Sequence, residues 1–182
     1  MATLLLVRHG KAAAGFGAHL DPGLDDLGRR QAAATARVLA PHGPLQIYSS
    51  PLARARETAS PLTERWGSEP IIEPRVSEIP APTDDLRERS AWLATVMPER
   101  WENLDQRLHL WRQALLDCLL DMQDDSVVFC HFIAINVAVG AATRDDRMIC
   151  FRPDNGSVTR LANHDGNLRL IELGREAETH VN

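Results

Sequence analysis

Short apolar runs that alternate with helix-forming stretches constrain the fold of this chain more than any other feature. The runs Leu4–Val7, Leu45–Ser49 and Val127–Cys130 have the length and composition of buried β-strands. A stretch rich in helix-forming residues follows the first run from Leu27 to Leu39, and it ends before Pro41, which disfavours helix at the residue preceding it. Strands that alternate with helices predict an α/β layer fold whose sheet is mostly parallel.

Three further patterns extend this interpretation. Ser50-Pro51 predicts the start of a helix, with Ser50 as the N-cap and proline at the first helical position. Apolar residues recur every three or four positions, which predicts an amphipathic helix packed on the core, at Leu104, Leu108, Trp111, Leu115, Cys118 and Met122. Near the end, Gly156–Leu161 and Leu168–Leu173 flank a polar turn, which predicts a hairpin at an antiparallel edge of the sheet.

Length and composition favour one globular domain spanning residues 1–182, because the chain has 182 residues and is 44% hydrophobic. A net charge of −5 argues against a nucleic-acid partner. The apolar N-terminal run is too short for a signal peptide, and the run Phe132–Ala142 is roughly half a membrane span. The cysteines, with no C-x-x-C spacing, fit reduced thiols. We therefore expect a cytoplasmic protein that binds neither nucleic acid nor membrane, with a homodimer left open.

Basic residues lie just beyond the ends of the three predicted strands. Arg8-His9-Gly10 follows the first strand, Arg54 lies in the first helical turn after the second, and His131 follows the third. Ligands of open α/β sheets bind at the carboxyl ends of strands, so these side chains could converge on one anion. Position alone leaves open whether they form a phosphate site or are separate surface residues.

Motifs along almost the whole chain resemble, in order, those of the histidine phosphatase (phosphoglycerate mutase-like) superfamily. The first is the R-H-G signature at Arg8-His9-Gly10. The others are an L-G-x-x-Q-A helix start at Leu27–Ala32, an S-S-P-L-x-R-A-x-x-T-A segment at Tyr48–Ala59, an acid at Glu78, the strand Val127–His131 and the closing segment Asn155–Thr159.

This resemblance implies a three-layer fold, in which helices flank both faces of the mostly parallel sheet, and a metal-free phosphatase mechanism. It implies that His9 attacks phosphorus and is transiently phosphorylated, as a neutral imidazole can do near pH 7. Cationic groups would stabilise the charge of the transferring phosphoryl group, so no metal ion or other cofactor is expected. The resemblance assigns phosphate binding to Arg8, Arg54, His131 and Gly10, and protonation of the leaving oxygen to Glu78.

Two of these assignments have competitors nearby in the sequence. Arg56 is two residues from Arg54 and so about 200° around the same helix, which means that only one of them can face the site. The spacing of the family motif favours Arg54. Asp84 and Asp85 compete with Glu78 for the role of general acid, and an ordinary solvated carboxylate is the alternative for all three.

Other chemistries fit the sequence less well. A cysteine phosphatase centred on Cys130 would need an arginine six residues later, where Asn136 stands. The histidines lack H-x-H and H-E-x-x-H spacing, which argues against a metal hydrolase. Charges of both signs alternate over residues 84–107, a pattern typical of a solvated face, with Arg87, Arg89, Arg100 and Arg107 among acidic residues.

The chain departs from the family pattern around the expected site. Lys11-Ala12-Ala13 follows the R-H-G signature, Ile79–Thr83 replaces a glycine-rich acidic stretch, and Phe132-Ile133 stands where two glycines are usual, so the pocket wall differs. We expect a phosphatase that acts on a small phosphorylated metabolite through a phosphohistidine. A phosphohistidine or phosphoprotein phosphatase, a phosphoglycerate mutase and an inactive phosphate-binding module remain as alternatives.

Overall fold

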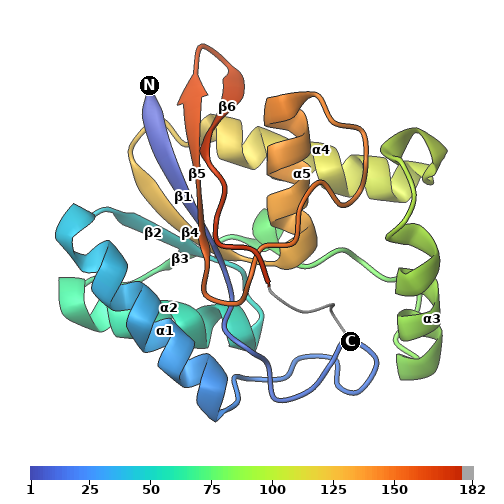
Figure 1. The fold of residues 1–182 in the computed structure, drawn as a ribbon, viewed down its shortest axis with the longest axis horizontal. Helices are drawn as coiled ribbons and strands as arrows, with labels where there is room; N and C mark the ends of the chain where they lie inside the picture. Colours follow the sequence, from blue (N-terminus) through green and yellow to red (C-terminus); the bar gives the residue numbers. More distant parts are fainter. Residues whose placement is uncertain (178–182) are drawn as a thin grey trace.

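A six-stranded mixed sheet, with strand order β3-β2-β4-β1-β5-β6, forms the centre of the protein (Figure 1). The structure is a computed structural model and describes residues 1–177. In chain order its strands and α-helices are β1 (Ala2–Arg8), α1 (Asp26–Leu39), β2 (Gln46–Ser49), α2 (Ala53–Trp66), β3 (Ile71–Ile72), α3 (Leu86–Val96), α4 (Gln106–Asp121), β4 (Ser126–Cys130), α5 (Phe132–Thr143), β5 (Val158–His164) and β6 (Asn167–Glu172).

The sheet is parallel in one half and antiparallel in the other. Strands β3, β2, β4 and β1 pair in parallel, whereas β5 pairs antiparallel with both β1 and β6. The three strands predicted from the apolar runs and the C-terminal edge hairpin are therefore confirmed. Strand β4 lies between β1 and β2, so the third apolar run is at the centre of the parallel half.

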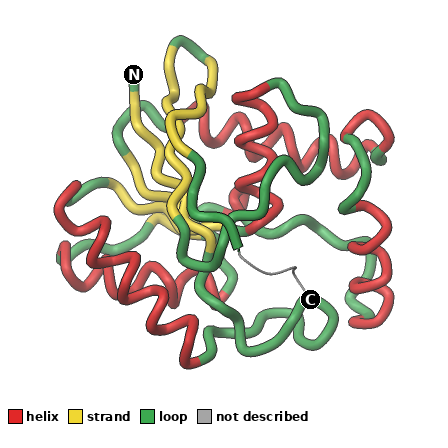
Figure 2. The backbone as a smooth tube through the Cα atoms, viewed as in Figure 1, coloured by secondary structure: helices red, strands yellow, loops and turns green. Residues whose placement is uncertain are grey.

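Helices cover both faces of the sheet, as Figure 2 shows with the strands in yellow between helices in red. Alternation along β1 divides the core: Leu5 and Val7 pack with residues of α1 and α2, whereas Leu4 and Leu6 pack with residues of α4 and α5. Successive side chains of a strand point to opposite faces, so a run that is apolar on both faces must be covered on both. The three-layer prediction is confirmed.

Local capping chemistry explains where two predicted helices begin. The Asp25 carboxylate accepts a hydrogen bond from the Gly28 N–H at 2.7 Å, and α1 starts directly after Asp25, at Asp26. Asp105 caps α4 in the same way by accepting from the Leu108 N–H at 3.0 Å, so Leu104 lies outside the helix. The predicted apolar stripe otherwise faces the core, with Leu108, Leu115 and Cys118 fully buried.

The predicted start of α2 is wrong by two residues. The helix begins at Ala53, and the Ser50 side chain does not cap it. Instead the Asp21 carboxylate, from a distant loop, accepts a hydrogen bond from the Ala53 N–H at 2.8 Å. Ser50 is fully buried with its hydroxyl 2.8 Å from His131 Nε2, so a tertiary contact has replaced the expected local one.

Two helices were not predicted from the sequence, for opposite reasons. Helix α3 buries only one residue, Val96, so its sequence has no clear apolar periodicity. Its first turn is capped by the Asp85 side chain. Helix α5 is buried at every residue from Phe132 to Gly140, so it has no polar face to reveal a helical period. Within residues 1–177, no helix is both long and apolar enough to cross a membrane.

Candidate active site

The register between β1 and β4 places two histidines side by side. Arg8 pairs with Cys130 in this parallel ladder, so the residues that follow them, His9 and His131, leave the sheet at the same point. The His9 N–H donates to the Cys130 carbonyl at 3.1 Å, and the two imidazole rings lie 5.2 Å apart between centroids. The parallel pairing itself therefore builds the centre of the site.

Strand β2 brings the third basic residue to the same edge. The Ser50 N–H donates to the Phe129 carbonyl of β4, and Arg54 follows in the first turn of α2. Arg54 Nε donates to His9 Nε2 at 3.2 Å, whereas Arg56 is exposed to solvent. Of the two competing arginines, the structure brings Arg54 to the histidines.

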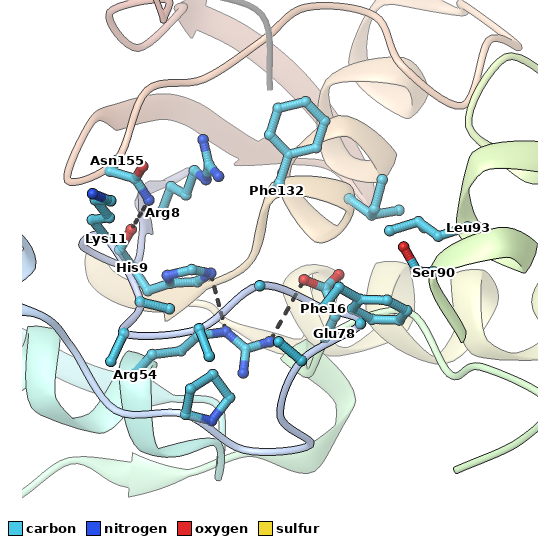
Figure 3. Close-up of a pocket in the computed structure, with 18 of the residues that line it drawn as sticks. Arg8, His9, Lys11, Phe16, Arg54, Glu78, Ser90, Leu93, Phe132 and Asn155 are labelled. Carbon is cyan, nitrogen blue, oxygen red and sulfur yellow. Dashed lines mark hydrogen bonds and ion pairs between the residues drawn. The ribbon is translucent and has the colours of Figure 1, made fainter. Parts of the chain in front are cut away.

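These residues form one wall of a cavity of about 1050 Å³ (Figure 3). Arg8, His9, Arg54 and Glu78 line it directly. His131 is fully buried and lies behind this wall, next to the His9 ring and the Glu78 carboxylate. Four of the expected side chains thus face one cavity and the fifth supports them.

The hydrogen bonds of His9 fix which ring nitrogen carries the proton. Nδ1 lies 2.7 Å from the Gly10 carbonyl, which can only accept, so Nδ1 is the donor. Nε2 then has a free lone pair, and it accepts from Arg54 Nε. Burial, and next the charge of Arg54, lower the pKa of His9 to about 3. The ring is a neutral imidazole whose nucleophilic nitrogen faces the guanidinium.

Gly10 holds the His9 ring in this orientation from behind. Its carbonyl receives the Nδ1 proton and its N–H donates to Thr58 Oγ1 at 3.0 Å, so in this structure Gly10 orients the histidine instead of offering its N–H to an anion. A Cβ on Gly10 would lie 2.5 Å from the Gly28 carbonyl oxygen at the start of α1. The close packing of these two backbones requires glycine in the R-H-G signature.

Glu78 is the acid that reaches the site. Its Oε2 lies 3.8 Å from Arg54 Nη2 and 3.7 Å from His131 Nδ1. Burial raises the pKa of Glu78 and outweighs the opposing effect of the Arg54 charge. A carboxyl group whose pKa is raised can hold a proton and donate it.

The two rival carboxylates serve elsewhere. Asp85 caps α3 by accepting from two backbone N–H groups, and the Asp84 side chain is 90% exposed. Neither lines the cavity.

Ser50 is a site residue that the sequence pattern assigned to a different task. Its hydroxyl accepts from the Leu52 N–H at 3.2 Å and forms a buried hydrogen bond with His131 Nε2 at 2.8 Å. The other ring nitrogen, Nδ1, lies 3.7 Å from Glu78 Oε2. No local signal could identify this role, because the two partners are 81 residues apart.

Asn155 is a second residue whose part in the site was not predicted. Its Nδ2 donates to the His9 carbonyl at 2.9 Å, and its side chain lines the cavity beside Lys11 (Figure 3). The closing motif Asn155–Thr159 marked the segment without indicating a function for the amide.

The electrostatics of the site favour an anion over a metal ion. His9, Glu78 and His131 offer ligand atoms within 4.8 Å of one another, a spacing that could hold a metal ion. Two guanidinium groups share this space, however, and burial lowers the pKa of both Arg8 and Arg54 because it disfavours their charged forms. A phosphate would relieve that cost, whereas a divalent cation would increase it.

Two further residues show how the surroundings decide a side chain's role. Cys130 is buried on β4, and burial raises the pKa of its thiol, so it is a packing residue. The prediction of a fully solvated charged face is wrong for Arg89. Its side chain is only 14% exposed, and its guanidinium carbon lies 4.3 Å from the centroid of the Phe16 ring.

Comparison with known proteins agrees with this geometry. The family model of the histidine phosphatase superfamily (branch 1) matches residues 4–175. The glucosyl-3-phosphoglycerate phosphatase of Mycolicibacterium vanbaalenii is 44% identical over 79 residues, which are 41% of this chain and 35% of that protein. The matched part thus spans about a third of the curated relative's length.

Solved structures match over nearly the whole chain. The structure of mycobacterial glucosyl-3-phosphoglycerate phosphatase in complex with VO3 is 26% identical, covers 95% of this chain and 98% of its own, and has a TM-score of 0.72. Phosphoserine phosphatase from Entamoeba histolytica in complex with 3-phosphoglyceric acid is 22% identical, covers 96% and 98% of the two chains, and has a TM-score of 0.75. At that identity the second likeness concerns the fold alone.

The His9 ring should stay neutral in the folded protein from neutral pH down to about pH 4, because its pKa is lowered to about 3. In the urea-unfolded chain the ring should titrate near its ordinary value of about 6.5. Between these values the unfolded chain binds the extra proton. The free energy of unfolding therefore falls as the pH drops, by about 1.4 kcal/mol per pH unit for this ring.

Nitrogen-15 NMR of the imidazole in both states measures the two midpoints. Arg54→Ala should raise the folded-state midpoint, since it removes a neighbouring positive charge. A wild-type folded midpoint near the ordinary value of about 6.5 would contradict the burial argument.

Replacing Ser50 by alanine should remove the hydrogen-bond partner of His131 Nε2. The buried nitrogen loses its partner, so we expect a loss of about 1–3 kcal/mol in the free energy of unfolding and altered shifts of both ring nitrogens. Ser77→Ala is the control. It removes a neighbouring hydroxyl, 3.4 Å from that of Ser50, and should leave the hydrogen bond between Ser50 and His131 in place. If the His131 nitrogen shifts are the same in wild type and Ser50→Ala, the serine does not hold the ring.

Proposed function

The chain belongs to the histidine phosphatase superfamily, and from this premise we propose that it hydrolyses a phosphomonoester through a phosphohistidine on His9. The observation that carries the proposal is the state of the His9 ring. Nδ1 donates to the Gly10 carbonyl, so the lone pair of Nε2 is directed at the guanidinium of Arg54, where a phosphoryl group would be held. A neutral, oriented imidazole beside buried cations is what an attack on phosphorus requires.

In the first step Nε2 of His9 attacks phosphorus as the bond from phosphorus to the ester oxygen breaks. The phosphoryl oxygens take over the Nε donor of Arg54. Arg8, whose Nη1 donates to the Pro153 carbonyl at 2.8 Å, offers its remaining guanidinium donors from the same wall. Glu78, with its raised pKa, gives its proton to the leaving oxygen. The products of this step are a free alcohol, a phosphohistidine and an ionised Glu78.

In the second step a water molecule attacks the same phosphorus and the bond from phosphorus to Nε2 breaks. The Glu78 carboxylate accepts the proton of that water, which returns Glu78 to its acid form. Inorganic phosphate leaves, and the His9 ring is again neutral. His131 lies behind the cavity wall, with Nδ1 3.7 Å from Glu78 Oε2, and it keeps Glu78 in reach.

A small phosphorylated metabolite is the proposed substrate. The relatives named above are phosphatases, which supports hydrolysis over a mutase reaction. What they act on is a property of those proteins, and the cavity of this chain has its own lining.

The phosphohistidine can be tested directly on the full chain. Brief mixing with an aryl phosphate in the presence of EDTA should give an acid-labile phosphoenzyme that mass spectrometry assigns to His9. His9→Ala should lose the adduct and lower kcat/KM by more than about 10³-fold, because alanine offers no nucleophile. Turnover that persists in His9→Ala, or that needs added Mg²⁺ or Zn²⁺ after EDTA, would overturn the mechanism.

The two arginines of α2 provide a matched pair. Arg54→Ala should lower kcat/KM about 10²-fold, equivalent to roughly 3 kcal/mol of transition-state stabilisation. Arg54→Lys should restore only part of this loss, since one ammonium cannot reproduce the forked geometry. Arg56→Ala should leave the rate near that of wild type, because Arg56 is exposed. A crippled Arg56→Ala enzyme with a normal Arg54→Ala enzyme would reverse the assignment.

A further inference from the structure

The cavity is much larger than a phosphate ion needs. Its volume of about 1050 Å³ is slightly above the roughly 300–1,000 Å³ typical of pockets for drug-sized ligands. Arg8, His9, Arg54 and Glu78 form one wall of it, and further polar residues also line it, among them Lys11, Arg152, Asp154 and Asn155. Figure 3 shows Lys11 and Asn155 beside His9, on the side of the phosphate site. Most of the remaining lining forms three walls that can contact the alcohol part of a bound ester, and their chemistry indicates which group fits there.

The first of these walls is the loop that follows the R-H-G signature. Residues 12–18 read A-A-A-G-F-G-A, and all of them line the cavity. None has a polar side chain, so apart from its backbone this stretch can offer a ligand only apolar contact. Phe16 is its largest side chain, and Figure 3 shows it next to Glu78.

The second wall is one side of α3. Four of its residues or close neighbours line the cavity, namely Ser90, Leu93, Ala94 and Met97, and only Ser90 carries a polar group. In Figure 3, Leu93 lies across the cavity from His9. A ligand that extends from the phosphate toward α3 would bury its surface against leucine and methionine.

The third wall is the first turn of α5. Phe132 and Ile133 line the cavity, and they are only 7% and 3% exposed. The Phe132 ring also lies under the Arg8 guanidinium, 5.0 Å from its carbon to the ring centroid. This aromatic side chain therefore connects the phosphate end of the cavity with its apolar part.

Packing behind the loop holds Phe16 in place. The guanidinium of Arg89 stacks on the ring, with its carbon 4.3 Å from the centroid. Gly17 packs directly on α3, since a Cβ there would lie 2.6 Å from Ser90 Cβ. The loop and α3 are thus docked on each other, and the apolar walls are preformed.

We propose that these three walls form an apolar subsite and that the substrate is the phosphomonoester of an alcohol whose aliphatic or aromatic group lies against them. The inference deepens the proposed function and rests on it for the reaction. A sugar or a carboxylate placed against these walls would lose hydrogen bonds to water, and the walls offer one hydroxyl in return. An alkyl or aryl group would gain by leaving water.

Binding of non-hydrolysable alkylphosphonates to the full chain tests the subsite without requiring turnover. Calorimetry with ethyl-, butyl-, hexyl- and 2-phenylethylphosphonate should show Kd falling about tenfold for every two added methylenes. The heat-capacity change should become more negative along the series, as burial of apolar surface requires. 3-Carboxypropylphosphonate, which places a carboxylate on the same alkyl chain, should bind at least about tenfold more weakly than butylphosphonate.

Variants locate the effect. Leu93→Ser and Phe16→Ala, on two different walls, should each reduce the ratio of ethyl to hexyl Kd by about threefold to tenfold. Leu110→Ser is the matched control, since Leu110 is 64% exposed on α4 and outside the cavity, and it should leave the ratio unchanged. Because each ratio compares two ligands on one protein, a general loss of stability does not imitate the result.

The outcomes separate this inference from the proposed function. Equal affinity along the series, tighter binding of the carboxylate, or a ratio that neither variant changes would overturn the apolar subsite, even for an active phosphatase. A steep series in a protein that neither forms a phosphoenzyme nor hydrolyses hexyl phosphate would uphold the subsite and overturn the phosphatase. A higher kcat/KM for hexyl phosphate than for glucose 6-phosphate and 3-phosphoglycerate, together with the steep series, would support both.

Discussion

The parallel pairing of β1 with β4 is the constraint on which the rest of the site depends. The hydrogen bond from the His9 N–H to the Cys130 carbonyl continues the ladder one residue beyond the sheet. It fixes His9 against His131, and the neighbouring β2 then delivers Arg54 to the same edge. A slip of one residue in this register would turn the side chains of one strand to the opposite face and separate the two histidines.

Burial is the second theme, because it acts on every titratable group of the site in a useful direction. It lowers the pKa of His9 and keeps the nucleophile neutral, and it raises the pKa of Glu78 and keeps a proton on the acid. It also disfavours the charged forms of Arg8 and Arg54, which gives an incoming phosphate a large electrostatic gain. One low-dielectric environment thus prepares nucleophile, acid and anion-binding groups together.

Features set by nearby residues could be predicted, and features set by distant residues could not. The strands other than β3, helix α1 and the terminal hairpin follow from short apolar patterns and local caps such as Asp25. Ser50 has the sequence of an N-cap, yet its hydroxyl bonds His131, and the cap of α2 comes from Asp21 instead. Arg89 lies in a charged stretch that is typical of a solvated face. Its guanidinium nevertheless stacks on Phe16, which belongs to a loop far away in the chain.

Composition and spacing within short segments are enough to predict the α/β layers, the family and the basic residues at the strand ends. The position of β4 between β1 and β2, the choice of Arg54 over Arg56 and the nitrogen of His9 that carries the lone pair depend on the tertiary structure. It alone assembled the apolar walls of the cavity from a loop and two helices. Hydrogen-bond partners and cavity walls are made by groups that meet only after the chain has folded, so no local pattern specifies them.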